Sequence, residues 1–215
     1  MSCFAVLEEF IKKYHSSYKK VLNKTAEYYP HGELSDCILG EYDGNLEGKV
    51  SWQAIQLDQS KSFSNVETAL NIELFPSINE FYGSFYSAPM FFYSAWGEGE
   101  LLQAWNHDDF ERLQQNIIGH LMMKQKLKQP LTWFIGVMDE EQMITVNNDD
   151  GSVWLEVAGE VPTQKLSDSI ESFISSLEPK VIEAEMPTNE TQVNVEHPGL
   201  IASFKRMWRN LVSYR

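Results

Sequence analysis

Acidic side chains are the most abundant chemically active residues in this sequence. It has 31 aspartates and glutamates among 215 residues, but their pattern does not single out two of them as an acid and base pair. Asp108, Asp109 and Glu111 lie close together, yet the positive end of a helix favours acids at such a place. A hydrolase with an unrecognised carboxylate pair therefore stays an alternative, and its sign would be two acids with raised pKa values in a deep pocket.

Other candidates for catalysis or metal binding are sparse. Cys3 and Cys37 are too far apart for a paired-cysteine zinc motif, and two cysteines in all favour a reducing compartment. The sequence has no glycine-rich dinucleotide fingerprint, no phosphate-binding loop and no His-Glu-x-x-His zinc motif. The five histidines are scattered, and we interpret His120 as a partly buried helix residue. We therefore expect no enzyme activity, no metal and no cofactor.

The charge of the chain is strongly negative and unevenly distributed. The formal net charge is -14. An average surface of this sign repels phosphate, which argues against nucleic acid as a partner. Residues 31–123 carry fourteen acids against three basic residues, whereas residues 199–215 carry four basic residues and no acid. This favours a cationic partner for the body and an anionic surface for the tail, unless the charge only maintains solubility.

Hydrophobic periodicity and turn residues predict the secondary structure that must position these charges. Helices are expected over residues 3–23, 65–71, 107–127 and 166–177, with a short one starting at Pro76. Strands are expected over residues 50–55, 90–96, 131–138, 142–146 and 152–157, and residues 97–100 are expected to form a loop. Ser64 and Glu67 match a capping box, and Asn106 is the predicted N-cap of the long helix.

This order of elements predicts the fold class. Helices and strands do not alternate strictly, so a single α+β domain over residues 1–179 is expected, with a mainly antiparallel sheet flanked by helices. Residues 180–198 read as a flexible linker. The longest uncharged run, residues 81–97, is too short and too polar to span a membrane, and the N-terminus does not resemble a signal peptide. We therefore expect a soluble, cytosolic protein.

The last 17 residues form a distinct amphipathic pattern. Residues 199–215 predict a basic helix in which Phe204 and Trp208 share one side, while Lys205, Arg206 and Arg209 lie on the other. A basic amphipathic helix with a tryptophan binds an anionic bilayer surface or docks into a groove. The alternative is a helix that folds back on the core of its own domain.

Several stretches of the chain resemble a known family. They are Ala69–Tyr82, Leu101–Leu121, Lys126–Pro130 and Phe134–Ile135, with the region around Phe173 and Leu177. Together they resemble the Syd family of bacterial SecY-interacting proteins over residues 4–179. The resemblance implies a non-catalytic domain of the immunity-type α+β superfamily that binds the cytosolic side of the SecY translocation channel. Such a protein would lie peripherally on the inner membrane, with a soluble pool, and monitor or restrain improperly assembled channels. Residues 180–215 extend beyond the family pattern and inherit nothing from it.

The resemblance and the charge pattern together suggest a binding face. Cytosolic loops of bacterial membrane proteins are rich in lysine and arginine, which an acidic face would attract. The candidate partner-binding residues are four acids and two tryptophans: Glu67, Glu73, Asp108, Asp109, Trp52 and Trp105. The basic tail is the candidate for contact with the membrane surface. An immunity or scaffold protein that binds a basic soluble partner, such as a toxin, remains an alternative.

Overall fold

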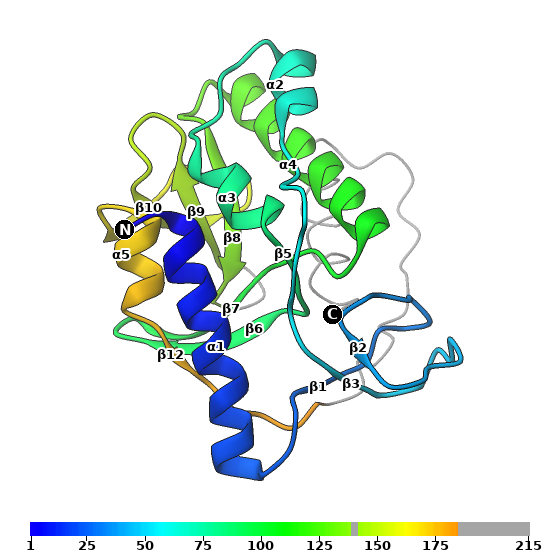
Figure 1. Ribbon diagram of the computed structural model, residues 1–215. Helices are drawn as coiled ribbons and strands as arrows, with labels where there is room; N and C mark the ends of the chain where they lie inside the picture. Colours follow the sequence, from blue (N-terminus) through cyan, green and yellow to red (C-terminus); the bar gives the residue numbers. More distant parts are fainter. Residues whose placement is uncertain (139–141, 185–215) are drawn as a thin grey trace.

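The computed structural model describes residues 1–138 and 142–184, which form an α+β fold (Figure 1). The helices in this part of the chain are α1 (Cys3–Leu22), α2 (Ser64–Leu70), α3 (Ser77–Gly83), α4 (His107–Leu127) and α5 (Ile170–Ser175). The strands are β1 (Glu27–Tyr28), β2 (Ile38–Leu39), β3 (Val50–Trp52), β4 (Ile55–Gln56), β5 (Phe85–Tyr86), β6 (Met90–Ser94), β7 (Gly97–Leu101), β8 (Thr132–Val137), β9 (Gln142–Asn147), β10 (Val153–Val157), β11 (Gln164–Ser167) and β12 (Glu178–Pro179).

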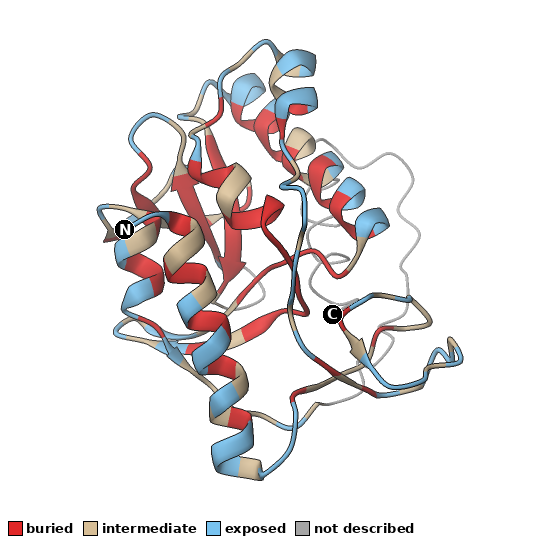
Figure 2. Ribbon diagram, viewed as in Figure 1, coloured by how far each residue is buried: buried red, intermediate tan, exposed pale blue. Residues whose placement is uncertain are grey.

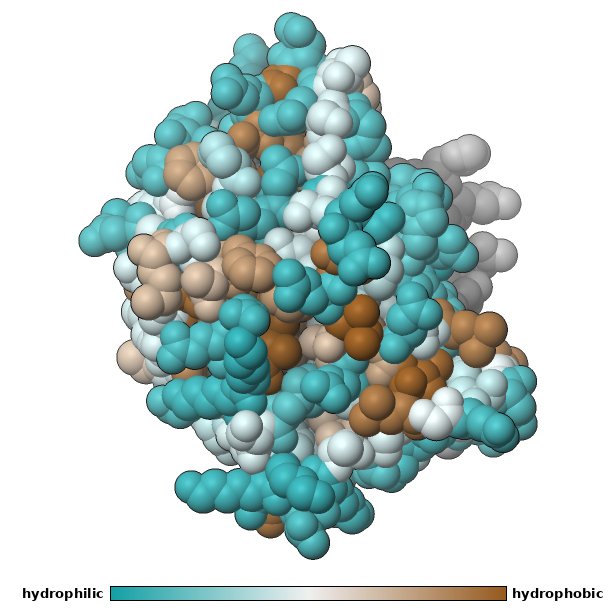
Figure 3. Space-filling model, viewed as in Figure 1, coloured by the Kyte–Doolittle hydropathy of each residue, from teal (hydrophilic) through white to brown (hydrophobic). Residues whose placement is uncertain are grey.

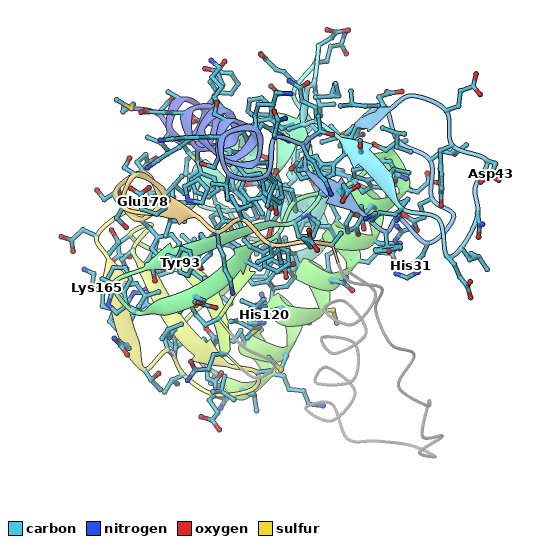
Figure 4. The ribbon with its side chains drawn as sticks, turned by 90° about the horizontal axis from the view of Figure 1, so that it is seen from below. His31, Asp43, Tyr93, His120, Lys165 and Glu178 are labelled. Atoms are coloured by element: carbon cyan, nitrogen blue, oxygen red, sulfur yellow. The ribbon has the colours of Figure 1, made fainter. Side chains whose placement is uncertain are left out.

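A seven-stranded antiparallel sheet forms the centre of the molecule. Its strand order is β11-β10-β9-β8-β7-β6-β12, and smaller sheets pair β1-β3-β2 and β4-β5. The views in Figures 1 and 4 show α1 and α4 on opposite sides of this sheet. Every residue of β8 is buried, as expected for a strand that is covered on both faces, and Figure 2 shows the buried residues concentrated between the helices and the sheet. The prediction of an α+β fold with a mainly antiparallel sheet is confirmed.

The two long helices lie close to where their sequence periodicity placed them. The helix expected over residues 107–127 has those bounds, and the side chain of Asn106 caps it by accepting a 2.8 Å hydrogen bond from the backbone N–H of Asp109. Lys128 ends it in a left-handed conformation before Pro130. The first helix begins after the N-cap Ser2, whose hydroxyl accepts from the N–H of Ala5.

One segment that was expected to be a loop is a strand in the large sheet. Residues 97–100 belong to β7, which pairs with β6 and β8. A Cβ atom at Gly99 would lie 2.6 Å from the ring of Phe92 and 2.6 Å from the carbonyl oxygen of Val137. The loop prediction is wrong because Gly99 permits close packing of neighbouring strands in the sheet. In the sequence, a glycine with this role looks the same as a glycine in a turn.

The closing helix is shorter than predicted. Leu166 lies in β11, and α5 begins only at Ile170. The hydroxyl of Ser169 accepts a hydrogen bond from the backbone N–H of Ser172 and so starts the helix at this point. The error arose because the spacing of apolar residues from Leu166 onward fits a helix. Leu166 itself is buried from its position in a strand.

The predicted capping box at α2 is not formed. Phe63 occupies the N-cap position and makes no side-chain cap, and Ser64 is already the first helical residue. The carboxylate of Glu67 accepts a 2.9 Å hydrogen bond from the backbone N–H of Leu74. Glu67 therefore holds the loop that follows α2 instead of capping its start.

A buried cluster of polar side chains joins α4 to the sheet. Lys124 Nζ lies 3.0 Å from Glu156 Oε1, and both side chains are fully buried. Glu156 Oε2 accepts hydrogen bonds from the hydroxyls of Thr132, at 2.8 Å, and Thr145, at 3.2 Å. Because Thr132 donates to Glu156, its oxygen accepts from His120 Nε2, at 2.9 Å. Figure 4 shows His120 between α4 and the strands. We call these five residues the buried charge cluster.

The described chain continues past the domain boundary that the sequence predicted. The backbone N–H of Lys180 donates to the carbonyl of Phe91 at 2.9 Å, and that of Ile182 donates to the hydroxyl of Tyr18 at 3.3 Å. Residues 180–182 are therefore attached to the domain, although they were assigned to the linker. The predicted linker from residue 185 onward and the predicted basic helix lie outside the described residues.

Candidate partner-binding surface

A loop-rich segment between β1 and β3 carries a concentration of exposed acids. This segment, residues 31–49, is here named the acidic arm and includes β2. Its charged residues are Glu33, Asp36, Glu41, Asp43, Glu47 and Lys49. The single lysine is neutralised from outside the arm, because its Nζ lies 2.9 Å from Glu27 Oε2. Figure 4 shows Asp43 at the outer edge of the molecule.

The acidic arm is held in shape by its own hydrogen bonds. The hydroxyl of Tyr42 accepts from the backbone N–H of Gly32 at 3.0 Å and donates to the carbonyl of Asn45 at 2.6 Å. The carboxylate of Asp43 accepts from the N–H of Asn45 at 3.0 Å, as in an Asx-turn. The chain reverses at His31 and Gly32, which both have positive φ. These contacts give the backbone that carries the exposed acids a defined shape.

Further contacts hold the acidic arm against the N-terminus of α4. The indole N–H of Trp105 donates to the carbonyl of Glu33, and the side-chain amide of Asn106 donates to the carbonyl of Leu34. The guanidinium of Arg112 lies 2.7 Å from both carboxylate oxygens of Glu33. This places the arm acids and the acids of the first turn of α4 at the same end of the molecule.

Exposed leucines lie among the acids of the arm. Leu34, Leu39 and Leu46 are 64%, 43% and 68% exposed. Figure 3 shows hydrophobic atoms interspersed with hydrophilic ones over this part of the molecule. Exposed apolar side chains within one short segment can supply apolar contact to a partner. The sequence analysis missed these leucines because no periodicity in the glycine-rich arm indicates which residues are exposed.

The two neighbouring aspartates of α4 have different roles. Asp108 is exposed and forms no ion pair with any described residue. Asp109 is buried: one carboxylate oxygen accepts a 2.8 Å hydrogen bond from the backbone N–H of Trp105, and the other lies 3.4 Å from Arg112. Asp108 is thus available to a partner, whereas Asp109 supports the junction between the acidic arm and α4.

The other two predicted acids lie outside α4, one in α2 and one in the loop that follows α2. Glu67 is engaged with the loop that follows α2. Glu73 is exposed, and its carbonyl accepts from the side chain of Asn148, in the turn that also holds Asp149 and Asp150. That turn is bonded to Leu131, just beyond the C-terminal end of α4. The structure therefore does not bring the four predicted acids together, because Asp108 and Glu73 lie near opposite ends of a long helix.

The two tryptophans proposed as aromatic contacts lie in the core. Trp52 is 2% exposed and Trp105 is 3% exposed, and their rings meet edge to face with centroids 6.4 Å apart. Neither ring is presented to a partner, so this part of the prediction is corrected. The reason is that large aromatic side chains gain most from burial, and Trp105 contacts the acidic arm through polar groups, its indole N–H and its backbone carbonyl.

The described residues hold few groups suited to catalysis. They contain no cluster of three or more metal-ligating side chains. Burial raises the pKa of the Cys37 thiol to about 11 and lowers the pKa of His15 to about 4. Desolvation also raises the pKa of Glu156, but this carboxylate is enclosed within the buried charge cluster. None of the helices in these residues is both long and apolar enough to cross a bilayer.

Comparison with known proteins identifies the family. The model of the family described as Syd protein (SUKH-2) matches residues 4–179. The chain belongs to the Syd family. It is 53% identical to Protein Syd of Shewanella baltica (strain OS185) and 52% identical to Protein Syd of Shewanella sp. (strain MR-7), over the full length of each pair. It is 49% identical to Protein Syd of Shewanella sp. (strain W3-18-1) over 98% of both chains. The Syd family model thus ends at residue 179, whereas these Syd relatives align through the basic tail as well.

Proposed function

We propose that this chain binds the cytosolic face of the SecY translocation channel through the acidic arm together with Asp108. Family membership supports the choice of partner. The observation that carries the proposal is the acidic arm itself, which combines exposed acids with three exposed leucines in one short segment. Such a surface suits a partner segment that is basic and partly apolar. The protein would then reside on the cytoplasmic side of the inner membrane, peripherally, with a soluble pool.

The charge of the arm matches the chemistry of the proposed partner. Among the described residues, Glu41, Glu47 and Asp108 form no ion pair. Cytosolic loops of bacterial membrane proteins carry an excess of lysine and arginine. Opposite charges of this kind accelerate association and orient the partners, and the effect decreases as salt screens it. The leucines would supply apolar contact that salt does not weaken.

Binding at this surface also suggests a regulatory role. A protein that occupies the basic loops of SecY would compete there with other cytosolic factors and would act on channels whose loops are uncovered. We therefore propose that it monitors or negatively regulates improperly assembled SecY. This predicts greater recovery of SecY from membranes in which SecY exceeds its partner subunits than from membranes with complete channels.

The test is recovery of SecY from detergent-solubilised membranes by the tagged full-length protein at low and high salt. The arm variant carries Glu41→Lys and Glu47→Lys, and the control variant carries Glu73→Lys and Asp149→Lys, which change the charge equally at the other end of α4. We expect the arm variant to bind SecY about tenfold more weakly at low salt and the control to bind like wild type.

Two results would contradict this assignment. Equal loss in both variants would show an effect of net charge, and loss in the control alone would move the binding surface to the region of Glu73. Failure of the folded wild type to recover SecY at low salt would reject SecY as the partner. Recovery of a basic soluble protein in its place would favour the immunity or scaffold role, since the acidic arm suits such a protein equally well.

We further propose that the basic tail contacts anionic lipid. Residues 199–215 lie outside the described structure, and the proposal rests on their sequence, which has four cations, no acid and an apolar side with Phe204 and Trp208. Lys205→Gln, Arg206→Gln and Arg209→Gln in the full-length chain should reduce its sedimentation with vesicles of phosphatidylethanolamine and phosphatidylglycerol. Unchanged sedimentation would reject the lipid contact.

A further inference from the structure

One carboxylate of the acidic arm is occupied by an arginine of the same chain. Arg112, in α4, approaches Glu33 through a single nitrogen, Nη2, which lies 2.7 Å from each of the two carboxylate oxygens. The Arg112 side chain is 46% exposed and the Glu33 side chain is 40% exposed, so solvent and an incoming ligand can reach both. Ion pairs at such exposure contribute little to folding. The pair can therefore open without a large loss of stability.

The backbone of the arm is held at this point by contacts other than the ion pair. The carbonyl of Glu33 accepts a hydrogen bond from the indole N–H of Trp105, and the carbonyl of Leu34 accepts one from the side chain of Asn106. The hydroxyl of Ser35 donates to the carbonyl of Trp105. These hydrogen bonds remain when the ion pair opens. The ion pair thus affects the charge that the arm presents more than the shape of the arm.

A second carboxylate lies within reach of the same arginine nitrogen. Nη2 of Arg112 is 3.4 Å from Oδ1 of Asp109, which precedes it by one turn of α4. Asp109 is buried, and its other oxygen, Oδ2, accepts a hydrogen bond from the backbone N–H of Trp105, which fixes the position of the carboxylate. A guanidinium that leaves Glu33 therefore still has an anionic partner, and this lowers the cost of the exchange.

We propose that Glu33 is a binding position for an arginine of the partner, and that Arg112 occupies this position until the partner displaces it. The proposal rests on the function proposed above, because it concerns the same acidic arm, and it adds Glu33 to the binding residues. A partner guanidinium can approach the carboxylate with two nitrogens, one for each oxygen, which is the strongest geometry for this pair. Arg112 serves both oxygens with one nitrogen, so the incoming contact is the stronger one. Arg112 then pairs with Asp109.

This exchange makes the arm selective for arginine over lysine. A lysine ammonium is a compact point charge and cannot form the contact with two nitrogens, so it gains less when it replaces Arg112 at Glu33. Arg112 also repels every cationic ligand before it is displaced. It therefore weakens the binding of isolated cations and favours segments in which an arginine is accompanied by other contacts.

The test is binding of full-length variants to oligoarginine and oligolysine peptides of equal length, measured by fluorescence anisotropy at low salt. The variants are Arg112→Gln, Glu33→Gln and the two changes combined. The matched control is Lys165→Gln, which breaks an exposed ion pair of 2.6 Å with Asp168 in a strand at the edge of the large sheet and changes the net charge equally. Limited proteolysis of each variant reports whether the arm keeps its shape.

We expect Arg112→Gln to bind oligoarginine about fivefold more tightly than wild type, and the control to lie within about twofold of wild type. In the Glu33→Gln background, the gain from Arg112→Gln should fall below about twofold, because Arg112 no longer blocks a carboxylate there. Wild type should prefer oligoarginine to oligolysine by about threefold, and Glu33→Gln should reduce this preference.

Four results would overturn the exchange at Glu33. They are an equal gain in the control, a gain of the same size in the Glu33→Gln background, an unchanged preference for arginine in Glu33→Gln, and weaker binding with faster cleavage of the arm in Arg112→Gln. The last result would show that Arg112 supports the arm instead of blocking it.

Recovery of SecY from detergent-solubilised membranes by the same variants separates this proposal from the choice of partner. If wild type recovers no SecY while Arg112→Gln still gains affinity for oligoarginine, SecY is rejected and the exchange at Glu33 stands. If wild type recovers SecY and Arg112→Gln gains nothing with either ligand, SecY stands and the exchange is rejected.

Discussion

Two groups of charged residues in this molecule have opposite surroundings. The buried charge cluster places Lys124 and Glu156 between α4 and the sheet, where each charge is met by a partner. The acidic arm presents carboxylates to solvent, and its acids use few hydrogen bonds beyond those that shape the loop. Buried charges are costly to leave unpaired, whereas exposed ones contribute little to folding. The cluster therefore serves the fold, and the arm is free to serve a partner.

The largest expected effect comes from breaking the buried pair. Lys124→Met leaves Glu156 charged and unpaired in the core, and we expect a loss of about 3–5 kcal/mol in the free energy of unfolding. The control is Lys49→Met, which breaks the exposed pair with Glu27 and should cost less than about 1 kcal/mol. Urea unfolding followed by circular dichroism measures both. Adding Glu156→Gln to Lys124→Met should regain at least half of the loss. Similar losses in the two single variants would remove the contrast between buried and exposed charge.

The buried charge cluster also predicts a dependence of stability on pH. Desolvation, aided by the nearby Lys124, lowers the pKa of His120 from 6.5 to about 3. The unfolded chain therefore binds a proton that the folded chain excludes, and stability falls as pH decreases from about 6.5 toward 3. The slope is about 1.4 kcal/mol per pH unit, or about 2 kcal/mol at pH 5. Burial raises the pKa of Glu156, so the folded chain binds a proton at this carboxylate more readily than the unfolded chain does. Protonation of Glu156 at low pH therefore stabilises the fold and opposes this trend.

Comparison with His120→Gln isolates the contribution of the histidine, because Glu156 remains in both proteins. Thermal unfolding is measured from pH 7 to pH 5 in matched buffers. His15, whose pKa burial lowers to about 4, is likewise present in both and cancels from the difference. The wild type should lose more stability than the variant over this range. Parallel curves for the two proteins would show that His120 does not titrate on unfolding.

Much of the fold could be predicted because local and long-range preferences agree. The periodicity and capping of α4 determined both of its ends, and the turn at residues 148–151 fixed the hairpin of β9 and β10. The errors occurred where the sequence around one residue fits two different local structures. Gly99 suggested a turn but permits close strand packing, and Leu166 continued a helical spacing from within a strand. Tertiary contacts decide between such readings, and the sequence alone does not contain them.

The binding surface was less predictable than the fold. The sequence indicated that acids were important, and Asp108 was placed on an exposed helix end. It could not show that Glu73 lies near the other end of α4, or that Trp52 and Trp105 are buried. The acidic arm was not selected, because its acids are spaced irregularly among glycines and its importance arises from the contacts that join it to α4.

The smallest expected effect on stability separates the two aspartates at the point where the acidic arm meets α4. Asp109→Ala removes the carboxylate that accepts from Trp105, and we expect a loss of about 1.5 kcal/mol, in the range for a hydrogen bond to a charged group. Asp108→Ala should change stability by less than about 0.5 kcal/mol, because that side chain is exposed.

Limited proteolysis should then cleave the acidic arm faster in Asp109→Ala only, because the contact between the arm and Trp105 is weakened in that variant. SecY binding should fall in both variants, through a loosened arm in Asp109→Ala and through a lost charge in Asp108→Ala. If Asp109→Ala were as stable and as protease-resistant as Asp108→Ala, the acidic arm would not depend on the Asp109 carboxylate. The distinction between Asp109 as a supporting acid and Asp108 as a binding acid would then be wrong.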